Sequence, residues 1–214
     1  MRIWILPRNL RSSHGFRRFN LSSQTEKTEF IGGYKPDHEG HFRWVDGILI
    51  EAMRRGQWLV LDEINLARPQ VIERMNSLLD DDGYVVVTEH LHERWVQSKD
   101  YDRRKAQIVG GAEGRIGKDE DQTEYLEVKG TRLYRIHPDF RLFATMNPEE
   151  PAYAGRKAFS PALMNRFRVK WISELPLNEL RQILFDKRRR LAPAIQQRLP
   201  PELLEKMLRI HDWL

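Results

Sequence analysis

Apolar residues along this chain occur in two patterns, as short continuous runs and at helical spacing. The segments Gln57–Leu61 and Phe140–Thr145 are mostly apolar, which is typical of strands buried on both faces of a parallel sheet. From Pro69 onward, apolar side chains recur three and four positions apart until Asp80–Gly83, and this spacing predicts an amphipathic helix. Alternating strands and helices predict an α/β layered domain.

The N-terminal part is predicted to carry a small hairpin inside a helix. A short strand ends at Phe19–Leu21, and Ser22–Thr25 then offers capping hydroxyls for a helix that runs through Phe30. Gly32–Pro36 interrupts this helix, and His41–Val45 alternates like a strand. Helical spacing returns at Ile48–Met53. We therefore expect the hairpin to project from the middle of a helix.

The C-terminal half is predicted to contain a polar insertion and a helical end. Residues His90–Gln122 are mostly charged or glycine without a sustained period, so we expect a surface insertion that is mobile or partly disordered. The other expected elements are strands at 84–88, 125–128, 133–136 and 169–172, a short helix at 161–165, and helices from 177 and over 201–214. The last two helices resemble the start of a lid, which divides the chain into residues 1–175 and 176–214.

Composition narrows the class of protein. The 214 residues are 40% hydrophobic and 31% charged, as in an average soluble domain. The absence of cysteine excludes disulfides and thiolate metal sites and fits a reducing compartment, so we expect a cytoplasmic protein. No apolar run is long enough for a signal peptide or a membrane span. His90 and His92 lack further ligands nearby, so we expect exposed loop histidines there and no metal site.

The net charge of +5 favours an acidic partner such as a nucleotide or a nucleic acid. Part of this surplus lies in Lys187–Arg190, and such runs are more often solvated helix ends than docking patches.

Asp62 and Glu63 directly follow the first buried run. Ligands of α/β sheets bind at the carboxyl ends of the strands. In that position Asp62 can hold magnesium through water, while Glu63 polarises the water that attacks a nucleotide phosphate. The alternative interpretation is a strand that ends in a solvated acidic turn.

Two further polar positions belong to the same chemistry. Asn147 follows the second buried run, and its amide can hydrogen-bond the attacking water or the γ-phosphate. The alternative is an Asn-Pro turn. Arg166 follows the short helix at 161–165, from which its guanidinium can reach a phosphate held by a neighbouring subunit. Taken singly, it can equally be a surface or ion-pairing arginine.

Taken in order, these segments resemble the AAA+ ATPases, and more narrowly the branch of midasin, dynein-related and MoxR-like proteins. The resemblance runs from about Phe19 to about Leu184. The matching segments are Asn20–Thr25 and Ile31–Pro36 (second strand and entry to the helix-2 insert), Trp58–Ala67 (Walker B strand with Asp-Glu-Ile-Asn), Phe140–Asn147 (sensor 1) and Gly155–Phe167 (the approach to the arginine finger).

The resemblance implies a three-layer, P-loop-NTPase-like parallel sheet with a helix-2 insert hairpin, and an ATP hydrolase that uses ATP and Mg²⁺. It assigns Asp62 as the magnesium-site carboxylate, Glu63 as the catalytic glutamate, Asn147 as sensor 1 and Arg166 as the finger, with Arg156 and Lys157 as second choices. It also implies a ring, usually a hexamer, in which Arg166 acts in trans. Family members remodel protein complexes, often with a von Willebrand A domain partner, and the insert with Phe42 and Trp44 would face a substrate or partner.

One family feature has no counterpart in the sequence. Met1–Gly15 contains one glycine and no lysine, so the loop G-x-x-x-x-G-K-[ST] is missing there. Gly114–Asp119 is a decoy, because Asp119 replaces the magnesium-binding hydroxyl and the segment follows the Walker B strand. We therefore expect a core that is incomplete at its N-terminus and an isolated chain that hydrolyses ATP poorly.

Two explanations for the missing loop remain open, a truncated or split reading frame and a degenerate subunit. The alternative function is a non-catalytic interaction module that binds nucleic acid through its basic surface.

Overall fold

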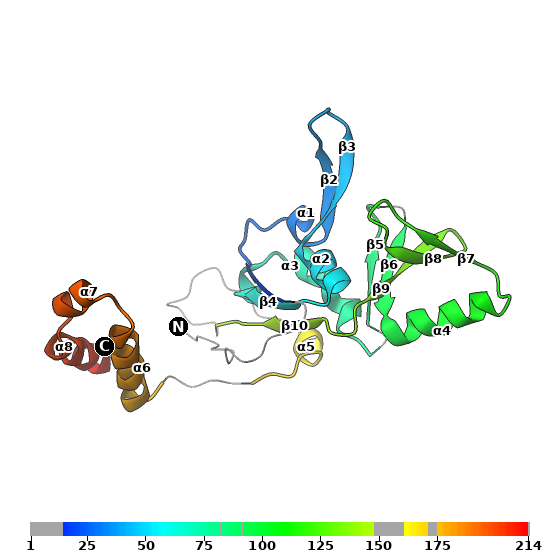
Figure 1. The fold of residues 1–214 in the computed structure, drawn as a ribbon. Coiled ribbons are helices and arrows are strands. Elements are labelled where there is room, and N and C mark those ends of the chain that lie inside the picture. The colour runs from blue at the N-terminus through cyan, green and yellow to red at the C-terminus, as the bar shows by residue number, and fades with distance from the viewer. Residues whose placement is uncertain (1–14, 82, 91, 148–160, 171–174, 214) are drawn as a thin grey trace. The chain divides into compact units, whose positions relative to one another are not determined.

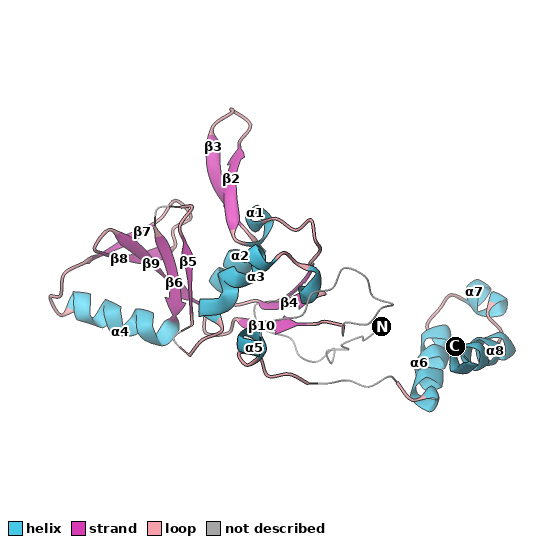
Figure 2. Ribbon diagram, turned by 180° about the vertical axis from the view of Figure 1, so that it is seen from behind, coloured by secondary structure: helices cyan, strands magenta, loops and turns pink. Residues whose placement is uncertain are grey.

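The computed structural model describes residues 15–81, 83–90, 92–147, 161–170 and 175–213. The described residues fall into two compact units, one that ends at Val169 and one that begins at Lys170. Figure 1 shows the elements of each unit along the chain, and Figure 2 shows them from behind.

The first unit is built on a three-stranded parallel sheet. Its strands are β1 (Phe16–Asn20), β4 (Trp58–Asp62) and β10 (Arg141–Ala144), with β4 in the middle. Leu59 and Leu61 are fully buried, as the apolar run predicted. The register pairs Asn20 with Asp62 and Ala144 with Leu61, so the carboxyl ends of the three strands meet at one edge. The expected α/β fold with a parallel core is confirmed.

The predicted hairpin inside a helix is also present. Helix α1 (Lys27–Phe30) is followed by the antiparallel strands β2 (Gly32–Pro36) and β3 (Phe42–Asp46), and then by α2 (Ile48–Arg55). Helix α1 ends at Phe30 as expected, and Ser22–Thr25 before it forms a turn in which the Ser22 amide donates to the Thr25 hydroxyl at 2.9 Å. A side chain at Gly47 would lie 2.4 Å from the Phe30 backbone, so only glycine lets the chain re-enter the helix there.

The segment after β4 is only partly α-helical. It comprises the 3₁₀ turn η1 (Ile64–Leu66), helix α3 (Pro69–Ile72) and the 3₁₀ helix η2 (Glu73–Leu78). Val71, Ile72 and Met75 are buried as the periodicity predicted. The apolar face was therefore predicted correctly, although the helix changes from α to 3₁₀ after Ile72.

A second sheet has the strand order β5-β6-β9-β8-β7. Its strands are β5 (Tyr84–Val87), β6 (Glu93–Gln97), β7 (Arg115–Lys118), β8 (Glu124–Val128) and β9 (Thr131–Ile136), and helix α4 (Ser98–Val109) joins β6 to β7. The β6–β9 pair is parallel and the other pairs are antiparallel. The predicted β8–β9 hairpin is confirmed, and its turn residues Lys129 and Gly130 both have positive φ, as a tight hairpin turn requires.

The expectation of a mobile or partly disordered insertion at His90–Gln122 is wrong. The segment supplies β6, α4 and β7, because a few large side chains provide a core that its polar composition conceals. Trp95 is fully buried and stacks on Tyr134 with ring centroids 4.9 Å apart. Tyr101 of α4 is also buried and donates to Glu124 at 3.0 Å.

The end of the first unit and the second unit are helical where described. Helix α5 (Pro161–Met164) forms as predicted, whereas Val169 and Lys170 are not in a strand and the rest of the expected strand at 169–172 lies outside the described residues. The second unit consists of α6 (Leu177–Arg189), α7 (Pro193–Arg198) and α8 (Pro201–Trp213). Leu204 and Leu208 are buried, and Arg181 pairs with Glu205 at 2.5 Å. None of the described helices is long and apolar enough to cross a membrane.

Candidate functional site

The predicted acidic pair lies at the carboxyl end of β4, where the backbone turns sharply. Glu63 has φ 55° and ψ 45°, a left-handed conformation that is uncommon for residues other than glycine. Such strain costs about 1–3 kcal/mol and is typical of functional sites. The Ile64 amide then donates to the Thr145 carbonyl at 2.9 Å, which fixes the turn against the end of β10.

Thr145 joins the two strand ends through its side chain. Its hydroxyl donates to Asp62 Oδ1 and accepts a hydrogen bond from the Glu63 amide at 3.3 Å. Its backbone amide donates to the Leu61 carbonyl at 2.9 Å. One threonine therefore holds both acidic residues in place.

The third predicted residue, Asn147, contacts Glu63 directly. Asn147 Nδ2 donates to Glu63 Oε1 at 2.7 Å. The Asn147 carbonyl in turn accepts from Asn65 Nδ2 at 2.9 Å, and Asn65 is almost fully buried. The structure thus brings Asp62, Glu63 and Asn147 together and fixes the Glu63 carboxylate through an amide.

Arg18 of β1 completes the surroundings of Asp62. Its Nε donates to Asp62 Oδ2 at 3.1 Å, and a terminal guanidinium nitrogen contacts the same oxygen. Burial raises the pKa of Asp62, but the hydrogen bonds from Thr145 and Arg18 outweigh burial and leave this pKa below its ordinary value. Asp62 is therefore ionised at neutral pH, as a ligand for a cation must be.

Arg166 lies apart from this cluster. It follows α5, and its guanidinium pairs with the Asp80 carboxylate through Nε and through a second nitrogen at 3.4 Å. The Arg166 side chain is 31% exposed. The second-choice residues Arg156 and Lys157 lie outside the described residues.

Sequence reasoning missed three members of the site, namely Arg18, Thr145 and Asn65. Residues two positions apart on a strand point to the same face. Thr145 lies two residues before Asn147, and Arg18 lies two residues before Asn20, so this spacing was a signal that each pair shares a face. The register that places Arg18 beside Asp62 depends on the pairing of β1 with β4. Strands about forty residues apart pair here, and such a pairing cannot be read from local spacing.

The polar groups at this edge suit magnesium. Within the part of the chain that the structure describes, no group of three or more His, Cys, Asp or Glu side chains could hold a metal ion. Magnesium is commonly held by one or two carboxylates together with waters and substrate phosphates, without a full protein cage. The ionised Asp62 carboxylate, with the Glu63 carboxylate next to it in the chain, fits this mode of binding.

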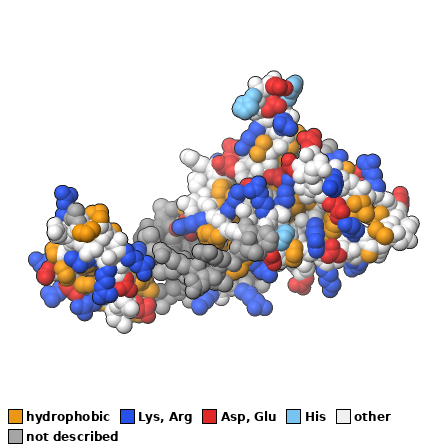
Figure 3. Space-filling model, in the orientation of Figure 1, with side chains coloured by type: hydrophobic (Ala, Val, Ile, Leu, Met, Phe, Trp, Pro, Cys, Tyr) orange, Lys and Arg blue, Asp and Glu red, His pale blue; other side chains and the backbone are white. Residues whose placement is uncertain are grey.

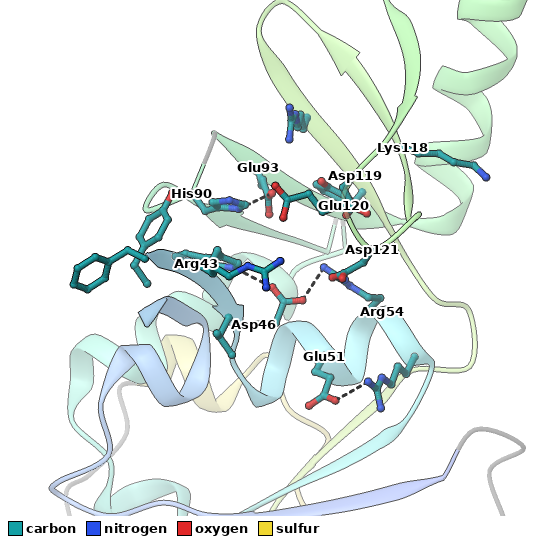
Figure 4. Close-up of a pocket in the computed structure, with 17 residues that line it drawn as sticks. Arg43, Asp46, Glu51, Arg54, His90, Glu93, Lys118, Asp119, Glu120 and Asp121 are labelled. Carbon is teal, nitrogen blue, oxygen red and sulfur yellow. Dashed lines mark hydrogen bonds and ion pairs between the residues drawn. The ribbon is translucent and has the colours of Figure 1, made fainter. Parts of the chain in front are cut away.

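A separate groove of about 990 Å³ lies between the β2–β3 hairpin and the second sheet (Figure 4). At its base Arg54 pairs with Asp46 at 2.7 Å and with Asp121 at 2.8 Å. The Glu93 carboxylate is almost fully buried 2.8 Å from His90. Burial, together with the charge of Asp46, raises the pKa of Glu93 to about 7.

His90 is not the exposed loop histidine that the sequence suggested. Its ring stacks on Trp44 with centroids 4.7 Å apart, and only 19% of its side chain is exposed. Burial lowers the pKa of His90. The aromatic side chain of Trp44 on the hairpin supplies this stacking partner, which the polar sequence around His90 does not indicate.

Comparison with known proteins shows the family of the chain. The AAA domain of the dynein-related subfamily matches residues 13–167. The chain therefore belongs to the AAA+ family, in its dynein-related subfamily. It is 33% identical to midasin of Dictyostelium discoideum over 190 residues and 30% identical to midasin of Giardia intestinalis over 192 residues, each covering 89% of this chain.

A cytoplasmic dynein heavy chain of Paramecium tetraurelia is 26% identical over 133 residues, or 58% of this chain. The chain spans only 2% of the length of that protein, and 2% and 3% of the two midasins.

Proposed function

We propose that this chain supplies the hydrolysis half of an ATP site and couples Mg²⁺-dependent ATP hydrolysis to the remodelling of a protein complex. The observation that supports this most is the hydrogen-bonded cluster of Asp62, Glu63, Thr145 and Asn147 at the carboxyl ends of β4 and β10. Membership of the AAA+ family adds independent support. The proposal extends to a cytoplasmic hexameric ring with a protein substrate or a von Willebrand A domain partner.

Each residue of the cluster has a distinct task in this proposal. Bound magnesium would supply positive charge to the phosphates. Asp62 would hold the hydrated ion through water, since its carboxylate is ionised and fixed by Thr145. Glu63 would orient the attacking water and accept its proton, with the Asn147 amide fixing the carboxylate at 2.7 Å.

Arg166 is proposed to act on the neighbouring subunit of a ring. Its hydrogen bonds go to Asp80 and not to the Asp62–Glu63 pair of its own chain. A partly exposed guanidinium held by a surface carboxylate can exchange that partner for a phosphate, because a surface ion pair contributes only about 0–1 kcal/mol. A finger in trans typically contributes about 10³–10⁵ in rate.

The phosphates need a further binding element. The 214 residues contain no G-x-x-x-x-G-K-[ST] sequence, so we propose that the isolated chain hydrolyses ATP poorly. A loop placed before β1, by extension of the chain or by a partner polypeptide, should restore hydrolysis.

The test is phosphate release by the chain assembled with such a loop. Glu63→Gln should lower the rate by roughly 10²–10⁴, the usual contribution of a general base, while ATP affinity stays within about twofold. Glu73→Gln serves as the matched control, because Glu73 is exposed on η2. A Glu63→Gln assembly that hydrolyses ATP as fast as the control would refute the assignment.

A nucleic-acid-binding module is the second candidate, and it rests on the basic run Lys187–Arg190. Arg188 donates to the carbonyls of Leu199 and Gln196, and Arg189 pairs with Asp186. Figure 3 shows the basic side chains of the helical unit scattered among acidic and apolar ones. Half of the run is thus engaged within the unit. Binding to duplex DNA with a steep salt dependence would favour this candidate over the ATPase.

A further inference from the structure

Arg18 places a positive charge directly on the proposed magnesium ligand. Strand β1 pairs with β4 so that Asn20 lies opposite Asp62. Arg18 lies two residues before Asn20 and therefore points to the same face of the strand. Its guanidinium donates to Asp62 Oδ2 through two nitrogens. The Arg18 side chain is 61% exposed, whereas that of Asp62 is 18% exposed.

Both oxygens of the Asp62 carboxylate are thereby engaged. Oδ1 accepts from the Thr145 hydroxyl, which is neutral and anchored in the cluster with Glu63. Oδ2 accepts from the guanidinium of Arg18, a side chain that is mostly exposed. A hydrated cation that approached Oδ2 would meet a like charge within a few ångströms, and the two would compete for the same lone pairs.

We propose that Arg18 is an internal counter-cation that competes with magnesium for Asp62. Without metal, Arg18 neutralises a carboxylate that burial would otherwise destabilise. When the ion binds, the guanidinium moves into solvent, which costs little because most of its surface is already exposed. Arg18 thus sets the magnesium concentration at which the site fills. This inference rests on the proposed role of Asp62 as the magnesium-site carboxylate.

The neighbouring residue provides a matched control. Arg17 points to the opposite face of β1, as successive strand residues do, and its guanidinium pairs with Glu51 of α2. Arg17→Gln therefore removes the same charge one residue away without touching Asp62. Any general effect of net charge on cation binding should appear equally in the Arg17 and Arg18 variants.

The experiment measures Mn²⁺ binding to the whole chain by the loss of the free-ion electron paramagnetic resonance signal. Arg18→Gln should bind Mn²⁺ roughly twofold to fivefold more tightly than the unmodified chain, as expected for the loss of a partly exposed ion-pair partner. Arg17→Gln should change the affinity by less than about twofold. Asp62→Asn should abolish this binding.

A second measurement uses the unmodified chain, so it does not depend on whether a variant folds. In the unmodified chain, magnesium should shift the Nε–H resonance of Arg18, since the ion displaces its carboxylate partner, and should leave that of Arg17 in place. Arg18→Met keeps the apolar stem without the charge and should reproduce the tighter binding of Arg18→Gln.

The possible failures are distinguishable. If Asp62→Asn abolishes binding but neither Arg18 variant tightens it, competition by Arg18 is overturned while the metal role of Asp62 stands. If Asp62→Asn binds Mn²⁺ as well as the unmodified chain, the metal role of Asp62 is overturned, and the competition with it. An Arg17→Gln effect as large as that of Arg18→Gln overturns a specific role for Arg18.

Discussion

Replacement of Trp95 by alanine tests whether the second sheet is a folded part of the core. Trp95 is fully buried on β6, stacks on Tyr134 with centroids 4.9 Å apart, and has the Arg54 guanidinium 5.5 Å from its ring centroid. Truncation would open a cavity beside Tyr134 and leave Arg54 without its aromatic partner. Trp95 itself lies in the segment His90–Gln122, which the sequence alone suggested to be mobile.

The expected loss in the free energy of unfolding is large. Truncation of a buried tryptophan to alanine typically costs about 3–5 kcal/mol, and lost aromatic stacking contributes about 0.5–1.5 kcal/mol beyond area burial. A natural domain has only about 5–15 kcal/mol of stability. Trp95→Ala should therefore lower the urea midpoint strongly or unfold the first unit at 25 °C.

Urea unfolding followed by far-UV circular dichroism and amide hydrogen exchange provides the assay. Trp44→Ala is the control, because Trp44 is partly exposed on the hairpin. Trp44→Ala should lower the free energy of unfolding clearly less than Trp95→Ala does. In the unmodified chain the amides of β6 and β9 should be protected as well as those of β4. A Trp95→Ala chain with an unchanged midpoint, together with fast exchange in β6, would refute the inference that this sheet is part of the core.

Two further predictions concern the polar clusters. Thr145→Val should lower the free energy of unfolding by about 1–2 kcal/mol, since the charge-assisted hydrogen bond to Asp62 and the acceptor for the Glu63 amide are lost. A thermal unfolding midpoint equal to that of the unmodified chain would show that Thr145 does not stabilise the fold in this way. The folded-state pKa of Glu93, about 7, lies above its ordinary value of 4.5. The native state therefore binds more protons, and stability falls as the pH rises from 4.5 to 7. Glu93→Gln should remove this loss, of order 1–3 kcal/mol, so that urea midpoints at pH 5 and pH 8 converge; an unchanged difference between these midpoints would contradict it.

The strand end that carries Asp62 and Glu63 was easier to predict from the sequence than the second sheet. The run Trp58–Leu61 and the Asp-Glu pair after it form one local pattern, so strand and site could be predicted together. Asn147 follows a second such run. The sheet containing β6 and β9 depends on the stacking of Trp95 and Tyr134, which lie far apart in sequence, and its composition therefore resembled that of a polar loop.

The contacts of single side chains were harder to predict. Arg18 reaches Asp62 only through the β1–β4 register, and Arg166 pairs with Asp80 across more than eighty residues. Local periodicity carries no information about either pairing. The residue types at the site were therefore predictable, whereas their charged partners required the fold.

The central claim is that Glu63 acts within its own subunit and Arg166 on the neighbouring one. Rings completed with a phosphate-binding loop, in which Arg166→Ala subunits are mixed with Glu63→Gln subunits, test it most directly. Each variant alone should be nearly inactive, since the lost group stabilises the transition state. Mixed rings should regain part of the ATPase rate, because some interfaces then pair an intact glutamate with an intact finger. Absence of any recovery in mixed rings that demonstrably exchange subunits would contradict the account.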